Sequence, residues 1–559
     1  MDSNQQKVID SEEKRIVVEA PAGYGKTTTM VKKIEKDIVN KNINNYSKIL
    51  CLSFSIAASR KMKESLKNIN TDNTNIGIIA TNYHGFCRKI LEKYGYLILG
   101  DKEFNLKTTV DSKFEEVLKT LSEKDKNFLL GFDNCIKHAK LNKESIEIGL
   151  HRYNQIIIKN YYQKGYITFN SIITLAIQLL LEHDELKKAY SCLFKFIYVD
   201  EFQDTNVLCL YLLNLIITDE THVALFGDPI QQIYKFAGSV PNILEKEATY
   251  LKAIYMELKT NYRFKNNKEM QLTDNYLRNL YKGNTLTNQK VTLKIVKANN
   301  QYEEAEKIST IIRKNPDFTY GILYRGQKLD STLIIKKMIK HACDKYGISY
   351  IDTTIDDVRL KSFQKEVFEK FVKYFSEKKI NKLTLKSFLV TLRKKNYNKT
   401  YLALLKAFFM QEISSDLDDW QKKELVNEVL VHGELKIFIS ELNNNVTFST
   451  IHGAKGLEWD YIFLVDFRQN SFPNHMQLDL LHMQSEKNIF SYALNNNPEF
   501  KILISEFYVA ITRARKDYAV SYSTTFSYHK YNDQVITEKS NISCLASLPF
   551  FNTSFVKLS

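Results

Sequence analysis

The sequence predicts an α/β protein built from two lobes, each a parallel β-sheet flanked by helices. Short β-branched, apolar runs alternate with helical patterns twice, first between residues 15 and 228 and again between residues 291 and 521. Strands that alternate with helices form parallel sheets covered on both faces. The chain has 559 residues, beyond the size at which one hydrophobic core keeps growing, so two to four domains are expected.

The first lobe is predicted from five apolar runs. They lie at 15–20, 48–54, 76–81, 194–201 and 222–228. A helix is predicted over 59–69, because Met62, Leu66 and Ile69 recur on one helical face. The second lobe is predicted from runs at 291–296, 321–324, 446–450, 461–465 and 518–521.

Two further stretches, 96–165 and 355–440, are predicted to be mostly helical. Both are rich in Lys, Glu and Leu, and they contain few Gly and no Pro. Residues of this kind favour helices, whereas Gly and Pro interrupt them. We therefore expect each lobe to carry a helical insertion.

The composition limits which partners, cysteine-based sites and cellular locations are expected for the protein. The net charge is +15, from 79 basic and 64 acidic residues, which fits a phosphate-rich partner such as nucleic acid. None of the seven cysteines is spaced as CxxC, so a zinc or redox site is not predicted and free thiols are expected. The longest apolar run, 207–217, is too short to span a membrane. We expect a cytoplasmic protein with no membrane partner.

A phosphate-binding loop is predicted directly after the first strand. Residues 20–27 read APAGYGKT, a P-loop with Ala20 in place of the first glycine. Gly23 and Gly25 allow backbone N–H groups to turn toward phosphate oxygens. Lys26 is expected to contact the β- and γ-phosphates of ATP, and Thr27 to bind Mg²⁺.

A pair of carboxylates is predicted to face this loop. The apolar run that starts at residue 194 ends in Asp200 and Glu201, which places both acids at the carboxyl edge of the sheet. Asp200 fits a role on Mg²⁺, and Glu201 fits the base that polarises the attacking water. Alone, such a pair is usually a solvated strand end. Beside a P-loop, a catalytic role is favoured.

Several motifs of the sequence occur in the same order as those of a known protein family. Residues 200–205, DEFQDT, are similar to the DExxQD box of the UvrD/Rep/PcrA group of superfamily 1A helicases. The other matching segments, in the order of that family, are LSFS at 52–55, NYHGFC at 82–87, GDPIQQIYKFAG at 227–238, LKTNYR at 258–263, FSTIHGAKGLE at 448–458 and YVAITRA at 508–514. The resemblance covers nearly the whole chain and implies two RecA-like P-loop lobes.

The resemblance implies a nucleotide site drawn from both lobes. Gln5 would read the adenine edge, Tyr262 would stack on the adenine, and Glu458 would accept from the ribose. Gln231 would sense the γ-phosphate, while Arg263 and Arg513 would approach it as arginine fingers. The implied nucleotide-binding residues are Gln5, Ala22, Gly23, Gly25, Lys26, Thr27, Thr28, Tyr262, Gly456 and Glu458.

The resemblance also implies a path for single-stranded DNA across both lobes. Aromatic side chains in such paths stack on bases without regard to sequence. The implied DNA contacts are Phe54, His84, Tyr234, Phe236, Arg325, Thr450 and His452. Some positions depart from the family pattern, namely Ile56, Ala57, Ala237 and the segment TFNS at 168–171. These departures lie on the DNA side, whereas the residues of the ATP site are all present.

The motifs divide the chain into subdomains of the kind the family has. Lobe 1A is predicted at 1–95 and 166–270, a 1B-like helical insertion at 96–165, lobe 2A at 271–375 and 441–559, and a reduced 2B-like helical insertion at 376–440. Short chains of this build resemble the helicase subunit of Gabija-type anti-phage systems, which works with a nuclease-bearing partner subunit.

Two functions follow from the resemblance. The first is an ATP-dependent helicase or translocase that moves 3′→5′ on single-stranded DNA, in DNA repair or anti-phage defence. The alternative is an ATP-hydrolysing subunit that senses DNA ends or flaps and regulates a partner nuclease without processive unwinding. A P-loop kinase or GTPase is disfavoured, because neither predicts the motifs of the second lobe.

Overall fold

The computed structural model describes the chain as two compact units. Unit 1 is Met1–Arg263 and unit 2 is Phe264–Ser559. The described residues are 1–40, 47–54, 56–66, 77–100, 111–233, 238–284, 289–326, 330–354, 357–393, 397–411, 444–474, 497–529 and 535–556, with a few single residues between 422 and 477. Each unit is considered by itself below.

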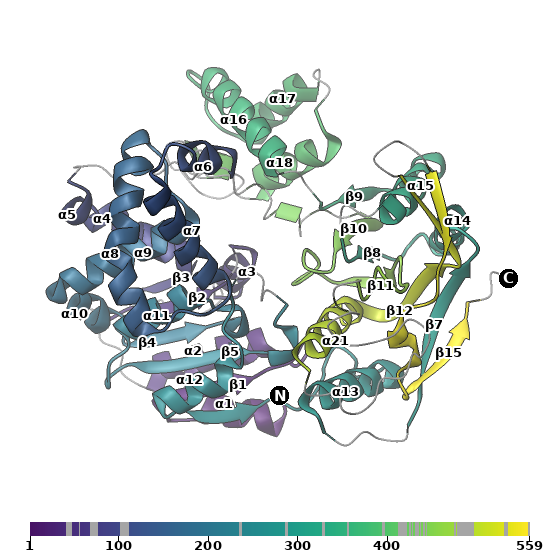
Figure 1. Ribbon diagram of the computed structural model, residues 1–559, viewed down its shortest axis with the longest axis horizontal. Helices are drawn as coiled ribbons and strands as arrows, with labels where there is room; N and C mark the ends of the chain where they lie inside the picture. The colour runs from purple at the N-terminus through teal and green to yellow at the C-terminus, as the bar shows by residue number, and fades with distance from the viewer. Residues whose placement is uncertain are drawn as a thin grey trace. The chain divides into compact units, whose positions relative to one another are not determined.

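The sheet of unit 1 has six parallel strands in the order β3-β2-β4-β5-β1-β6 (Figure 1). The strands are β1 (Arg15–Glu19), β2 (Ile49–Ser53), β3 (Ile78–Asn82), β4 (Phe196–Val199), β5 (His222–Gly227) and β6 (Ile254–Glu257). Because β4, β5 and β1 are neighbours, the residues that follow them meet at one edge of the sheet. This edge holds the predicted P-loop and the predicted carboxylates.

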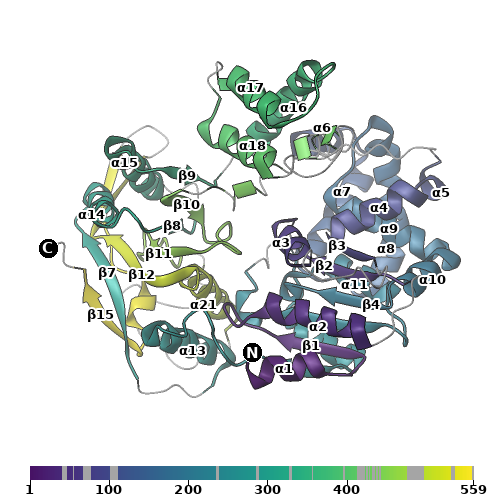
Figure 2. The same cartoon turned by 180° about the vertical axis from the view of Figure 1, so that it is seen from behind.

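Both faces of this sheet are buried. Along β4, Phe196 and Tyr198 pack into one core, whereas Ile197 and Val199 pack into the other. This alternation follows from the two-residue period of a strand. The first core is covered by α1 (Ser3–Asp10), α2 (Lys26–Asn40) and α3 (Ile56–Leu66). Figure 2 shows α2 in front of the sheet.

The second core of unit 1 extends into the predicted helical insertion. It is covered by α4 (Tyr83–Tyr94), α9 (Phe169–Glu182), α11 (Val207–Ile216) and α12 (Ile243–Leu251). The helices α7 (Glu123–Lys137) and α8 (Lys143–Asn160) add buried side chains such as Phe132 and Tyr153 to the same core. Shorter helices in unit 1 are α5 (Tyr96–Leu99), α6 (Asp111–Leu118) and α10 (Asp184–Leu193).

Unit 2 contains a second parallel sheet, with seven strands in the order β15-β7-β12-β11-β8-β10-β9. The strands are β7 (Val291–Ala298), β8 (Tyr320–Tyr324), β9 (Tyr350–Asp352), β10 (Val446–Thr450), β11 (Trp459–Leu464), β12 (Ala514–Ser523) and β15 (Phe551–Phe555). A separate hairpin pairs β13 (Thr525–His529) with β14 (Val535–Lys539). The α/β fold class predicted from the sequence is therefore confirmed in both units.

The helices of unit 2 fall into two groups. The first group lies around the sheet and consists of α13 (Lys268–Lys282), α14 (Gln301–Lys314), α15 (Asp330–Tyr346) and α21 (Pro498–Ile511). The second group consists of α16 (Asp357–Tyr374), α17 (Lys382–Arg393) and α18 (Lys399–Gln411), which share a core of their own. That core is rich in aromatic side chains, including Phe371, Phe388 and Phe408.

The strands missed by the sequence analysis lie at sheet edges or are very short. Strand β6 is the edge strand beside β1 and has no buried residue, β9 has three residues, and β15 buries only Phe551. An edge strand exposes much of its surface, so it lacks the run of apolar residues that marks a central strand. The predicted helix over 59–69 is α3, which ends at Leu66; Ile69 lies outside the described residues.

In the described part of the chain, no helix has both the length and the apolar character needed to cross a bilayer. All seven cysteines are described, and all are free thiols. Five of them are buried, as is common for free cysteines.

A buried carboxylate joins α14 to the central strands of unit 2. The Glu304 side chain accepts hydrogen bonds from the Asp466 backbone N–H at 3.2 Å, from Ser521 Oγ at 2.7 Å and from Ser523 Oγ at 2.5 Å. Glu304 has no exposed surface. Burial, together with the nearby Asp466 carboxylate, raises the pKa of Glu304 to about 7.

This raised pKa predicts a pH-dependent stability. The folded state binds more protons than the unfolded state between the ordinary pKa of 4.5 and about 7, so the free energy of unfolding should fall as the pH rises through that window. The fall should be on the order of 1 kcal/mol or more, because a tenfold change in proton affinity is worth about 1.4 kcal/mol. Glu304→Gln should lose this dependence, and denaturant unfolding at both ends of the window measures it.

The matched control is Glu306→Gln, which changes an exposed glutamate on the same helix. Its unfolding free energy should follow that of the unmodified chain across the window. If Glu304→Gln shows the same pH dependence as the control, the raised pKa is wrong.

Candidate active site

The P-loop lies between β1 and α2 in unit 1. Gly23 and Gly25 have φ values of +83° and +76°, in the left-handed region that glycine adopts without steric cost. A Cβ atom on Gly23 would lie 2.7 Å from Arg263 Cβ and 2.8 Å from Asn261 Oδ1. The backbone N–H groups of Tyr262 and Arg263 both donate to the Gly23 carbonyl, at 2.8 and 3.4 Å. The loop is thus packed against the segment 261–263, and glycine is required.

Lys26 lies between the two predicted carboxylates. Its Nζ is 3.2 Å from Asp200 Oδ1 and also pairs with Glu201 Oε1. Burial lowers the pKa of Lys26, but the Asp200 and Glu201 charges outweigh it and hold the pKa above its ordinary value. Burial raises the pKa of Asp200, with an opposing contribution from Lys26. A charged lysine therefore joins the end of β4 to the first turn of α2.

Glu201 is held in a strained backbone conformation. Its φ and ψ are 52° and 39°, in the left-handed region that costs a non-glycine residue roughly 1–3 kcal/mol. Residues kept in such conformations cluster at functional sites, because the surrounding structure over-determines them. The Glu201 backbone N–H donates to Asp200 Oδ1 at 2.9 Å.

Gln203 fixes the Glu201 carboxylate and was not singled out from the sequence. Its Nε2 donates to Glu201 Oε2 at 2.5 Å, and its Oε1 accepts from the Asp228 backbone N–H at 2.9 Å. Gln203 has no exposed surface. The signal in the sequence was its place within DEFQDT, but nothing there showed that it bridges the ends of β4 and β5.

Gln231 lies in the short 3-10 helix Pro229–Gln231, which follows β5. Its Nε2 donates to Asp228 Oδ2 at 2.7 Å, and the residue is buried. Because β5 lies between β4 and β1, this short helix starts at the same edge of the sheet as the P-loop.

Gln5 and Tyr262, predicted to bind adenine, are in direct contact. Tyr262 Oη donates to Gln5 Oε1 at 2.8 Å, and Gln5 Nε2 donates to the Tyr24 carbonyl at 3.4 Å. Gln5 also belongs to the capping box of α1 with Asp2. Tyr262 is 39% exposed, so part of its ring can receive a planar partner.

The residues present fit Mg²⁺ and a nucleotide triphosphate. Thr27 is half-buried in the first turn of α2, beside the exposed Thr28, and Ala22 is buried in the loop before it. Mg²⁺ takes one or two protein oxygens and fills its shell with water and phosphate. No group of three or more His, Cys, Asp or Glu residues suited to a metal occurs among the described residues.

Unit 2 holds the remaining residues of the predicted nucleotide site. Arg513 is buried after α21, where its Nε donates to the Val509 carbonyl at 3.1 Å and its Nη2 donates to Thr512 Oγ1 at 3.3 Å. Glu458 pairs with Arg515 at 3.5 Å, and Gly456 has a φ of +86°. The approach of these residues to a nucleotide stays a prediction.

His84, a predicted DNA contact in unit 1, lies in the first turn of α4, which is capped by Asn82. Burial lowers the pKa of His84 to about 4, so its ring is neutral at pH 7. It makes an edge contact with Phe169, with ring centroids 5.6 Å apart. Phe169 is 57% exposed and was not predicted from the sequence as a DNA contact. Phe54 directly follows β2 and is half-buried.

The other predicted DNA contacts have mixed surroundings. Tyr234 and Phe236 lie outside the described residues. Arg325, which follows β8, is largely buried and pairs with Glu506 at 3.0 Å. Thr450 Oγ1 accepts from the Gly453 backbone N–H at 3.0 Å, and His452 is half-buried in the turn after β10.

Comparison with known proteins gives a consistent result for unit 1. Residues 1–252 match the model of the UvrD/REP helicase N-terminal domain. This part of the chain is therefore similar to the UvrD/REP helicases. The ATP-dependent DNA helicase PcrA of Staphylococcus aureus is 26% identical to this chain over 278 residues, and PcrA of Staphylococcus epidermidis is 26% identical over 279 residues. Each alignment covers 47% of the chain and 38% of the relative.

The solved structures that resemble this chain are remote in sequence. One is a Saccharomyces cerevisiae Dbp5 variant bound to a Gle1 variant and IP6, with a TM-score of 0.36, 9% identity, and coverage of 95% of this chain and 82% of that one. Another is a Dbp5 variant bound to RNA and ADP–BeF₃, with a TM-score of 0.36, 10% identity, and coverage of 99% and 89%. Scores this low carry no functional argument.

The contacts of Gln203 predict a role in positioning the catalytic base. Gln203→Ala should lower kcat for ATP hydrolysis about 5- to 100-fold, because the lost hydrogen bond is worth about 1–3 kcal/mol. KM for ATP should change little, since Gln203 does not touch the P-loop glycines. Steady-state hydrolysis measures both parameters. Gln301→Ala, which removes a buried glutamine of unit 2 whose Nε2 donates to the Ser527 carbonyl at 3.0 Å, is the control, and equal losses of kcat would contradict the positioning role.

Proposed function

We propose that the chain is an ATP-driven motor that moves 3′→5′ along single-stranded DNA. The observation that carries the proposal is the cluster of Lys26, Asp200 and Glu201 at the end of a P-loop, with Glu201 strained and fixed by Gln203. The match of unit 1 to the UvrD/REP helicase N-terminal domain supports it. So does the likeness to PcrA chains, which are named ATP-dependent DNA helicases.

The roles of the residues in unit 1 follow from their positions. Mg²⁺ and ATP would supply the electrophilic γ-phosphorus and a cation that neutralises developing charge. Lys26 and the P-loop N–H groups would hold phosphate oxygens, and Thr27 with Asp200 would hold the metal. Glu201 would orient the attacking water and take its proton.

Nucleotide recognition would extend from the base to the γ-phosphate. The Gln5–Tyr262 pair would bind the adenine edge and face, and Gly456 with Glu458 would border the ribose. Gln231, Arg263 and Arg513 would respond to the γ-phosphate, a role that suits the permanently charged guanidinium fork. Loss of the γ-phosphate on hydrolysis would change the contacts of these residues, and this change would drive movement along the strand.

The DNA strand would contact aromatic and small polar side chains. In unit 1 these are Phe54, His84, Tyr234 and Phe236, and we add Phe169 because its exposed ring lies against His84. In unit 2 they are Arg325, Thr450 and His452. Neutral His84 would hydrogen-bond or stack rather than pair with phosphate.

A second function is favoured by one observation. Arg325 is held by Glu506 in a largely buried ion pair, which reduces the positive charge available to a strand. The chain would then sense DNA ends or flaps and regulate a nuclease-bearing partner subunit, as in Gabija-type anti-phage defence, rather than unwind DNA in repair. Strand displacement by the purified chain distinguishes the two, because only the motor separates a partial duplex unaided.

The first test is ATP hydrolysis with and without single-stranded DNA. The unmodified chain should be stimulated by DNA, and Lys26→Ala should lose at least about 100-fold in turnover, because a preorganised charge facing the phosphates is removed. Lys32→Ala, which changes an exposed lysine on the same helix, should hydrolyse ATP normally. Substantial turnover by Lys26→Ala would refute the P-loop assignment.

Glu201→Gln should separate binding from chemistry. The amide keeps a similar shape but cannot accept the proton of water, so turnover should fall about 10²- to 10⁴-fold. Binding of a fluorescent ATP analogue, measured by anisotropy, should stay within a few-fold of that of the unmodified chain. Loss of nucleotide binding would show that Glu201 supports the structure of the loop instead of activating water.

A further inference from the structure

A broad cleft lies beside the edge strand β9 in unit 2, and none of the residues that line it was assigned a role above. Its volume is about 960 Å³. One side is formed by the end of α15 and by β9, and the other by the start of α16 and of α18. Its lining includes three cations, two carboxylates and three tyrosines: Lys340, Arg359, Lys399, Asp344, Asp352, Tyr350, Tyr397 and Tyr401.

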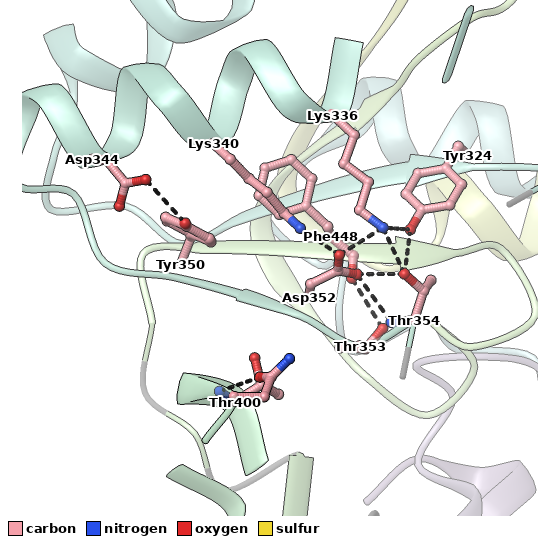
Figure 3. A network of polar contacts seen from close by, with 11 residues as sticks. Tyr324, Lys336, Lys340, Asp344, Tyr350, Asp352, Thr353, Thr354, Thr400 and Phe448 are labelled. Carbon is pink, nitrogen blue, oxygen red and sulfur yellow. Dashed lines mark hydrogen bonds and ion pairs between the residues drawn. The ribbon is translucent and has the colours of Figure 1, made fainter. Parts of the chain in front are cut away.

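Asp352, one of the two carboxylates that line the cleft, is paired with two lysines. Asp352 Oδ2 lies 2.6 Å from Lys336 Nζ and 2.5 Å from Lys340 Nζ, and Figure 3 shows both lysines reaching it from α15. Burial opposes the charge on Asp352, but the two lysines outweigh it and lower the pKa of this carboxyl. The three side chains together keep a net positive charge at neutral pH.

The other acid of the cleft is also engaged. Asp344 Oδ2 accepts a hydrogen bond from Tyr350 Oη at 3.2 Å. Lys399, at the first turn of α18, has no ion-pair partner within the described ranges. Asp352 is thus outweighed by Lys336 and Lys340, and Lys399 adds a further cation to the lining, so the cleft favours an anionic partner.

The tyrosine rings are held by bonds to their hydroxyl groups. Tyr397 Oη donates to Glu366 at 2.7 Å and is also bonded to Lys370. Tyr350 is fixed through Asp344 and by an edge contact with Phe448, with ring centroids 6.0 Å apart. Both rings are half-buried, so each keeps an accessible part within the cleft. Ordered rings between cations are suited to unpaired bases on a phosphate backbone.

The sequence around the cleft strengthens this assignment. The segment 357–411, which contains α16 to α18, has 14 basic and 4 acidic residues. Residues 412–440, which contribute to the same core, have 3 basic and 7 acidic residues, so the segment 357–440 keeps a net charge of +6. The hydrophobic core of these helices accounts for their apolar residues but not for this charge. Phosphate groups gain affinity from such an excess through counterion release.

We propose that this cleft binds single-stranded DNA as a second contact in unit 2, with Lys399, Arg359 and Lys340 on phosphates and Tyr350 and Tyr397 beside bases. The proposal rests on the proposed action on single-stranded DNA and adds a separate place where the strand is held. It also gives the small helical group α16 to α18 a role in holding the strand.

The test is equilibrium binding of a labelled oligothymidylate to the full chain, without nucleotide, over a range of salt concentrations. Lys399→Glu should weaken binding several-fold and reduce the slope of log affinity against log salt by about 0.7, the value for one lost phosphate contact. Lys386→Glu makes the same charge change at an exposed site on α17, away from the cleft, and should leave the slope unchanged. Equal slopes for the two variants would overturn the proposal.

Cross-linking gives a second readout that does not depend on charge. A bromodeoxyuridine-substituted single strand, irradiated on the full chain, should form adducts on Tyr350 or Tyr397, and a blunt duplex should not. Adducts confined to unit 1, or equal adducts with the duplex, would also overturn the proposal. If the chain does not hydrolyse ATP but Lys399→Glu reduces the salt slope and the adducts form, the proposed motor function is wrong and the DNA-binding cleft is supported. If DNA stimulates hydrolysis but Lys399→Glu and Lys386→Glu give equal slopes, the motor function is supported and the cleft proposal is wrong.

Discussion

The rest of the site depends on one constraint at the edge of the unit 1 sheet, namely that the buried Lys26 must be paired with carboxylates. A lysine can stay charged in a buried position only if carboxylates are brought to it. The order β4-β5-β1 does this, because three neighbouring parallel strands end at the same level and present Asp200, Asp228 and the P-loop together. Gln203 then joins the ends of two of these strands. Any change in strand order would separate the lysine from its counter-charges.

Much of this arrangement could be predicted from the sequence, for a physical reason. Strands that are buried on both faces must be apolar throughout, so the central strands of the two units left a clear pattern. Edge strands such as β6 and β15 did not, because water covers part of their surface. The P-loop and the acid pair were found because phosphate chemistry demands fixed residue types at fixed spacing.

The interactions that the sequence did not reveal depend on contacts between distant segments. The role of Gln203 depends on its hydrogen bonds to Glu201 and to the Asp228 backbone, which form only when β4 and β5 lie side by side. Phe169 can be recognised as a candidate DNA contact only because the fold places its ring against His84. Conversely, the resemblance implied that Arg325 contacts DNA, whereas in the fold it is paired with Glu506, 181 residues further along the chain. Sequence spacing predicts local chemistry well, but pairings across the core require the fold.

The left-handed backbone of Glu201 has a consequence for how this protein can change. The conformation favours glycine or asparagine at that position, so the glutamate is kept at the expense of conformational energy. Stability and turnover therefore make opposite demands on one residue. If ATP hydrolysis were no longer under selection in a related protein, glycine or asparagine could replace Glu201. The resulting protein would be more stable but would not hydrolyse ATP.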